Sequence, residues 1–225
     1  MAETEEEPRR QIIALCLLTL AAGTMDALAF LKLDEVFTSA MSGNTVFFGI
    51  ALGQGRTLGA AHSVAAFAGY AVGIVATSFL LRDDKRSRVM IVTIELLPLA
   101  AFAALWTLLG GPQGGWIFAL IILSAIAMGI QAALARRLKL PGVMTTIITG
   151  TLTSMIGSVA ERLATRTRPA ITPSARRQAL IYSMYLIGAT LLGATIGSIP
   201  NATPFFPLAL VGAAVIGLRA GLIEL

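Results

Sequence analysis

Residues 37–49 read Phe-Thr-Ser-Ala-Met-Ser-Gly-Asn-Thr-Val-Phe-Phe-Gly. This stretch carries too many hydroxyl and amide groups for an ordinary lipid-facing helix, and it is too apolar for a loop in water. Residues 144–152 form a weaker copy, Met-Thr-Thr-Ile-Ile-Thr-Gly-Thr-Leu. When residue 37 is set against residue 144, threonine meets threonine and glycine meets glycine. A hydroxyl-rich, glycine-interrupted segment that occurs twice in an apolar chain is typical of a membrane site built from two internal repeats.

The composition excludes an ordinary soluble domain. The 225 residues are 56% hydrophobic and 13% charged, with a mean hydropathy of +0.81, whereas about 25% of the residues in a soluble domain are charged. The net charge of +5 is expected of a membrane protein, because Lys and Arg collect in cytoplasmic loops. No motif for reading nucleic acid accompanies the basic residues, so we expect no nucleic-acid partner. The single cysteine and the single histidine predict neither an internal disulfide nor a histidine-based metal site.

Six apolar runs approach the roughly 20 residues that a helix needs to cross the hydrocarbon core. They cover residues 11–31, 59–81, 89–109, 116–135, 178–199 and 205–222. The two hydroxyl-rich segments, at 38–52 and 144–160, are short for a crossing. We therefore predict an all-α polytopic integral membrane protein with six spanning helices and two short re-entrant or broken helices.

An alternative topology has eight spans, with both hydroxyl-rich segments crossing the membrane. With the N-terminus inside, that topology leaves about half of the Lys and Arg residues outside the cell, whereas six spans leave only Lys32 and Arg56 outside. Because positive residues favour the cytoplasmic side, the six-span topology is predicted, with both termini cytoplasmic and the chain in the inner (plasma) membrane. Three crossings per half is an odd number, which inserts the two halves in opposite directions as inverted repeats.

The expected organisation is a disordered tail over residues 1–10, a first membrane repeat over 11–109 and a second over 116–222, together forming one membrane domain. Tyr70 and Gly73 in the first repeat match Tyr185 and Gly188 in the second. An inverted repeat brings its two interrupted segments towards the bilayer midplane from opposite faces, so the functional site is expected between them.

The candidate substrate-binding residues are polar side chains in and beside the two hydroxyl-rich segments, which can accept or donate hydrogen bonds. They are Asp26, Thr38, Ser42, Asn44, Gln131, Thr145 and Thr149. Gly43 and Gly150 are predicted to open the backbone there, because glycine tolerates conformations that other residues avoid. Asp26 and Gln131 occupy matching places in the first helix of each half, and Asp26 could carry a proton or bind a cation.

Each candidate also has a purely structural interpretation. Ser and Thr in helices commonly bond to the preceding turn. Asp26 is close enough to Lys32 to lie at the membrane surface instead of in a site. Glu95 falls early in its span, so we favour a structural role, in which it caps the helix or meets the basic loop before it, over a functional role.

The quoted motifs also resemble a known family. Residues 37–45, 131–138 and 144–153 are similar to the YoaK-like family of bacterial membrane proteins, which contain a domain of unknown function. The resemblance covers nearly the whole chain and implies a polytopic inner-membrane protein, but no substrate and no catalytic residue. Ala132 departs from the asparagine that the family has after Gln131, which weakens a polar role there.

We predict a membrane transporter or channel for a small polar solute or ion, with its site at the midplane. The alternatives are a membrane scaffold or binding protein without transport activity, and an intramembrane enzyme. The sequence holds no HExxH, GxSxG or P-loop motif, so the protein is not expected to be an enzyme. No cofactor is expected, and the expected partners are the solute, the lipid bilayer and a second copy in a homodimer.

Overall fold

The computed structural model describes residues 3–80, 85–138, 148–165 and 173–225, and these residues form helices and connecting turns without strands. The helices are α1 (Glu3–Lys32), α2 (Met41–Gly53), α3 (Thr57–Leu80), α4 (Lys85–Leu109), α5 (Trp116–Arg137), α6 (Ile148–Thr165), α7 (Pro173–Thr195) and α8 (Phe205–Arg219). The prediction of an all-α protein is confirmed.

Five of these helices are long and apolar enough to cross a membrane, namely α1, α3, α4, α5 and α7. Each coincides with a predicted span. The sixth predicted span corresponds to α8, which has 15 residues and is therefore only about 22 Å long. The hydroxyl-rich segments contain α2, with 13 residues, and α6, with 18 residues. The described helices thus fit a polytopic membrane protein, while the number of crossings stays a prediction.

The N-terminal residues differ from the expected disordered tail. The first helix begins at Glu3, so residues 3–10 continue α1 in the structure.

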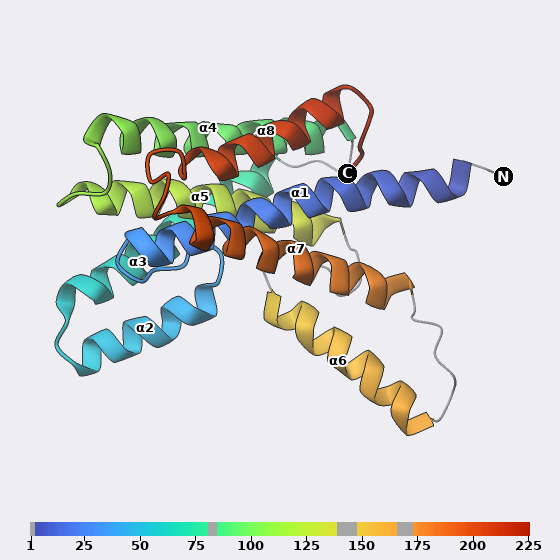
Figure 1. Ribbon diagram of the computed structural model, residues 1–225, viewed down its shortest axis with the longest axis horizontal. Coiled ribbons are helices and arrows are strands. Elements are labelled where there is room, and N and C mark those ends of the chain that lie inside the picture. The colour runs from blue at the N-terminus through green and yellow to red at the C-terminus, as the bar shows by residue number, and fades with distance from the viewer. Residues whose placement is uncertain (1–2, 81–84, 139–147, 166–172) are drawn as a thin grey trace.

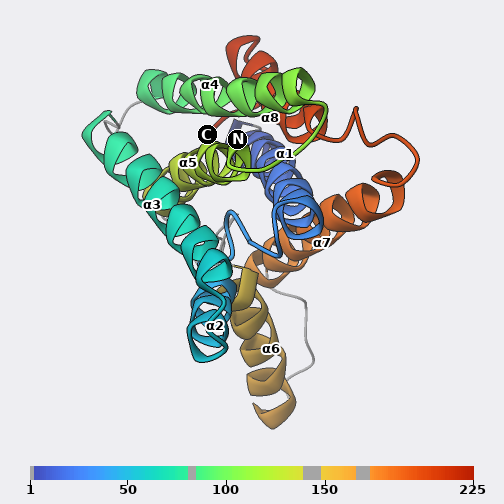
Figure 2. The ribbon, with the colours of Figure 1, turned by 90° about the vertical axis from the view of Figure 1, so that its left-hand side faces the viewer.

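Two central helices organise the bundle. In Figures 1 and 2, α1 and α5 lie in the middle, α4 and α8 cover one side, and α2 and α6 project from the opposite side. The helix α1 packs on α7 and α8, whereas α5 packs on α3 and α4. Among the described elements, α2 packs mainly on α3, with Phe47 also reaching Phe30 of α1, and α6 packs on α7. Each central helix therefore has its main partner in the other half of the chain.

Glycines allow these central contacts to be close. A Cβ atom on Gly23 of α1 would overlap the backbone carbonyl oxygen of Tyr185 on α7. A Cβ atom on Gly129 of α5 would overlap the carbonyl oxygen of Tyr70 on α3 in the same way. Small residues at such crossings let helix backbones approach each other, which is how helices associate in lipid.

The two ends of the bundle carry different polar contacts. At one end, Arg10 donates to the Gly221 carbonyl at 3.2 Å and Arg88 donates to the Leu225 carbonyl at 3.0 Å. Both chain termini lie towards this end (Figure 1). At the other end, His62 Nδ1 of α3 lies 3.0 Å from Asp34 Oδ2, just beyond α1.

Candidate functional site

The chain folds back into the bundle after α1. Asp34 and Glu35 have φ angles of 66° and 60°, a left-handed conformation that is uncommon outside glycine. The chain then returns until Thr38 and Ser39 lie beside Asp26. Asp26 precedes the end of α1 by six residues, which is about 9 Å along a helix. We call residues 33–40 the return segment; it is non-helical and ends inside the bundle, where α2 begins.

Asp26 holds the return segment through hydrogen bonds. Its Oδ1 accepts from the backbone N–H groups of Thr38 and Ser39, at 2.7 and 2.8 Å, and from the Thr38 hydroxyl at 3.0 Å. Its Oδ2 accepts from the Ser39 hydroxyl at 2.5 Å and from the Tyr185 hydroxyl of α7 at 2.6 Å. Asp26, Thr38 and Ser39 are all almost fully buried.

These contacts change the role expected for Asp26. An ionised carboxylate is an acceptor with about four lone-pair sites, and five donors already surround it. Little capacity is left for a solute or a cation. Asp26, which is 2% exposed, therefore fixes the return segment to α1 and α7.

Asn44 closes the same segment from the other side. Its Oδ1 accepts from the Phe37 backbone N–H at 2.8 Å, and its Nδ2 donates to the Phe37 carbonyl at 2.6 Å. The Phe37 ring stacks on both Phe30 of α1 and Phe47 of α2, with centroid distances of 5.2 and 5.9 Å, and those two rings also lie 6.2 Å from each other. The fully buried Asn44 side chain thus replaces the hydrogen bonds that Phe37 lacks outside a helix.

Gly43 does not open the backbone. It lies within the first turn of α2 and has no positive φ. A Cβ atom here would sit 2.8 Å from Cδ2 of Phe37. The expectation for Gly43 is therefore wrong, because this glycine makes room for an aromatic ring instead of permitting an unusual backbone conformation.

Two other predicted residues lie apart from the Asp26 cluster. The Ser42 side chain is exposed at the start of α2. The buried Gln131 donates from Nε2 to the Leu18 carbonyl of α1 at 2.9 Å. Leu18 is two helical turns before Asp26, which is about 12 Å along the helix. Gln131 thus joins α5 to α1 at a different depth from Asp26.

The second hydroxyl-rich segment is described only in part. Thr145 lies outside the described residues, whereas Thr149 and Gly150 belong to the first turn of α6. Gly150 is exposed there. Its helical state gives no support to a backbone-opening role.

Tyr185 belongs to the cluster although it was not among the candidate binding residues. Its match with Tyr70 marked it only as a sign of the repeat. A tyrosine in the middle of an apolar span could have indicated a polar partner, because buried tyrosine hydroxyls usually find one.

Comparison with known proteins places these features in a family. The profile of the family described as protein of unknown function (DUF1275) matches residues 14–217. The chain belongs to the DUF1275 family. The UPF0700 transmembrane protein YoaK of Bacillus subtilis (strain 168) is 29% identical over 181 residues, which are 79% of this chain and 80% of that protein. No solved structure matches the chain. The resemblance found in the sequence is thereby confirmed.

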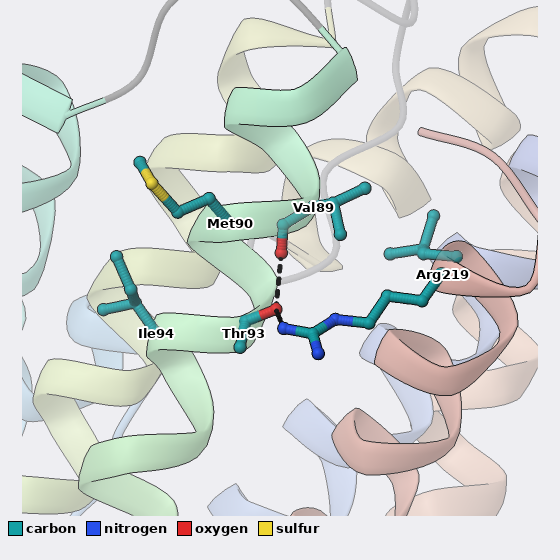
Figure 3. A pocket seen from close by; sticks show the side chains of 6 residues that line it. Val89, Met90, Thr93, Ile94 and Arg219 are labelled. Carbon is teal, nitrogen blue, oxygen red and sulfur yellow. Dashed lines mark hydrogen bonds between the residues drawn. The ribbon is translucent and has the colours of Figure 1, made fainter.

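Two hollows in this DUF1275 protein lie away from Asp26. One, of about 420 Å³, opens between α4 and α8 and is lined by Val89, Met90, Thr93, Ile94, Leu218 and Arg219. Figure 3 shows the Arg219 guanidinium reaching Thr93 across this hollow, a contact of 3.4 Å. The other, of about 30 Å³, lies between the return segment, α2 and α3, next to Asp34, Glu35 and Arg56. Its volume suits about one water molecule.

Proposed function

We propose that the protein is a membrane transporter or channel for a small polar solute or ion, with its site between two inverted repeats. The observation that carries this proposal is the later part of the return segment, where the non-helical residues Thr38 and Ser39 are buried in the bundle and their backbone N–H groups are bonded to Asp26. Irregular backbone at membrane depth occurs where it is buried in protein or lines a polar cavity. Broken helices of this kind form the central sites of many transporters.

Matching glycine contacts support the repeat. Gly188 of α7 lies against the Leu20 carbonyl, and Gly73 of α3 lies against the Ile126 carbonyl. In these contacts, Gly23 of α1 corresponds to Gly129 of α5, and Leu20 of α1 corresponds to Ile126 of α5. The two pairs are separated by the same number of residues along the sequence. In this register, Asp26 corresponds to Ala132 and not to its neighbour Gln131. We infer that the carboxylate anchor belongs to the first half alone.

The charges support six crossings with both termini cytoplasmic. Lys32 and Arg56 flank α2, at the end of the bundle where α1 finishes. Arg10 and Arg88 lie at the opposite end, with the C-terminus. Since basic residues favour the cytoplasm, we assign that opposite end to the cytoplasmic face of the inner membrane.

The start of α2 is the surface that we assign to the solute. Its N-cap residue, Ala40, supplies no side-chain hydrogen bond, and Ser42 is exposed in its first turn. The N–H groups of Met41 and Gly43 already donate to the Ser39 and Ala40 carbonyls, so the partial positive charge of this helix N-terminus is what we assign to a polar or anionic group. Asp26 and Asn44 act there as positioning residues that hold the backbone leading into α2.

A liposome-swelling assay tests the proposal. Vesicles containing the full-length protein are diluted into isosmotic potassium chloride, glycerol, urea or a neutral amino acid, and swelling is followed by light scattering. We expect at least one solute to enter faster than into protein-free vesicles. Ser42→Ala should slow that entry severalfold, whereas Thr190→Ala, which removes an exposed hydroxyl bonded only within α7, should not. Vesicles that remain impermeable to every solute would contradict transport.

The one-sided packing of α2 and α6 favours a second candidate, a membrane scaffold or homodimer. Within the part of the chain that the structure describes, both helices have exposed apolar side chains, including Val46 at 60% exposure and Ile156 at 57%. Disulfide crosslinking of Val46→Cys in a Cys16→Ala background would reveal a dimer through α2. A dimer in vesicles that move no solute would favour the scaffold.

A further inference from the structure

The buried face of α4 contains a carboxyl group without a partner. Glu95 is 0% exposed, and neither of its side-chain oxygens has a hydrogen-bond partner within the described part of the chain. The residues one turn before and one turn after it, Ile91 and Leu99, are equally buried, and Phe102 continues the same face. This environment differs from that of Asp26, whose carboxylate is surrounded by donors.

No ion pair with Glu95 occurs among the described residues. The helices packed against α4 are α5, α8 and α3. The charged and titratable residues on these neighbouring helices are Arg136 and Arg137 at the end of α5, Arg219 at the end of α8, and His62 and Tyr70 in α3. On α4 itself, besides Glu95, they are Lys85, Arg86 and Arg88 at its start. The Arg88 guanidinium bonds to the Leu225 carbonyl and that of Arg219 to Thr93, while His62 lies against Asp34.

An unpaired carboxylate in such surroundings is costly, whereas the neutral acid is tolerated far better. A metal cation is a poor occupant, because cations such as Ca²⁺ and Mg²⁺ take about six or more oxygen ligands. The neighbouring buried positions on this face are Ile91, Leu99 and Phe102, which supply none. The proton is the one cation that a single carboxyl group can bind alone.

The helix α4 also contains a proline close to Glu95. Pro98 lies inside α4, one turn after Glu95, and it has no N–H to donate to the Ile94 carbonyl. Proline is the usual cause of bends in membrane helices. Bending of α4 at Pro98 would alter how the Glu95 side chain sits against α5 and α8, and would let water reach it.

We propose that Glu95 is a proton-binding site that couples solute movement to the proton gradient, an inference that rests on the proposed transport function. The neutral acid occupies the closed bundle. When α4 bends, the O–H bond breaks, the proton passes to water on one side, and the carboxylate is hydrated until a proton from the other side restores the acid.

Infrared spectroscopy tests the proton directly, using the full-length protein in lipid vesicles titrated over pH. Wild type should show the carbonyl-stretch band of a protonated acid, and this band should disappear as the pH rises. Glu95→Gln should lack the band above about pH 6, where ordinary carboxyl groups are ionised, while Glu35→Gln, which changes an exposed carboxylate of the return segment, should retain it. A band that persists above this pH in Glu95→Gln, or that does not titrate in wild type, would overturn the proposal.

Proton flux then tests the coupling separately from transport. Pyranine-loaded vesicles receive a gradient of whichever solute causes swelling. Wild type should move protons with the solute, and Glu95→Gln should move solute with proton flux reduced to the level of protein-free vesicles. Solute entry with equal proton flux in both proteins refutes the coupling. Absence of solute entry in wild type refutes the proposed function instead, while the infrared titration still decides whether Glu95 exchanges a proton.

Discussion

The Tyr185 hydroxyl donates a 2.6 Å hydrogen bond to Asp26 Oδ2, joining residues that lie 159 positions apart in the chain. The bond links α7 to α1 at the level where the return segment enters the bundle. One phenol thus connects the packing of the two halves to the position of the segment that leads into α2.

Removing this phenol should weaken the whole arrangement. We expect Tyr185→Phe to lower the free energy of unfolding by roughly 1.5–3 kcal/mol, the usual worth of a hydrogen bond to a charged group. Tyr182→Phe changes a half-buried tyrosine of the same helix that is not among the donors to Asp26, and it should change this free energy by less than about 0.5 kcal/mol. Equilibrium unfolding in detergent, followed by circular dichroism, measures both. Equal stability of the two variants would mean that the hydroxyl does not hold Asp26.

Asn44 and Ser42 provide a matched pair within α2. Asn44→Ala leaves the Phe37 N–H and carbonyl without partners, so we expect a loss of roughly 2 kcal/mol, since unsatisfied buried groups cost about 1–3 kcal/mol. Ser42→Ala removes an exposed hydroxyl and should leave unfolding unchanged. Proteolysis of the return segment should accelerate in Asn44→Ala alone. A larger effect from Ser42→Ala would contradict the structural role assigned to Asn44.

The glycine crossing of α1 and α7 predicts sensitivity to a single methyl group. Gly23→Ala places a Cβ atom against the Tyr185 carbonyl and should destabilise the protein by about 1–3 kcal/mol, the typical cost of overpacking. Gly212→Ala in α8 meets nothing within 4 Å, and replacing a helical glycine there should stabilise by roughly 0.5–1 kcal/mol. Thermal unfolding should separate the two variants in opposite directions. A neutral Gly23→Ala would show that this contact is looser than described.

Cysteine labelling checks the six-span topology. Single cysteines at Arg56 and Arg136 are introduced into a Cys16→Ala background, and intact cells are treated with a membrane-impermeant maleimide. The proposed orientation exposes position 56 to the reagent and protects position 136 until the cells are lysed. Reversed labelling would favour the eight-span alternative with the same cytoplasmic N-terminus.

The sequence predicted the helices well because apolar length alone determines most of a membrane helix. It also located the polar segment after α1, since hydroxyl-rich residues are conspicuous in an apolar chain. The helical state of residues 3–10 was not predicted, because composition does not show that a helix extends beyond the apolar run. For α8 the error is the opposite one. The apolar run predicted a helix to residue 222, but the helix ends at Arg219.

The roles of individual site residues were harder to predict. Whether Asp26 binds a solute or backbone depends on contacts with Thr38 and Ser39 that only the fold of the return segment creates. The exposure of Ser42 depends on which side of α2 faces α3. Gly43 was misjudged because a glycine that accommodates a ring looks the same in sequence as one with unusual backbone angles.

The partnership of α1 with α7, and of α5 with α3, also bears on biogenesis. When α1 and α3 leave the ribosome, the helices that will cover them have not yet been synthesised. In the bilayer, shielded by lipid or by the insertion machinery, α3 must wait until α5 has been translated, and α1 must wait until α7 near the end of the chain has been translated. Assembly of the bundle is therefore a late, post-insertion event in which the two halves interlock instead of folding one after the other.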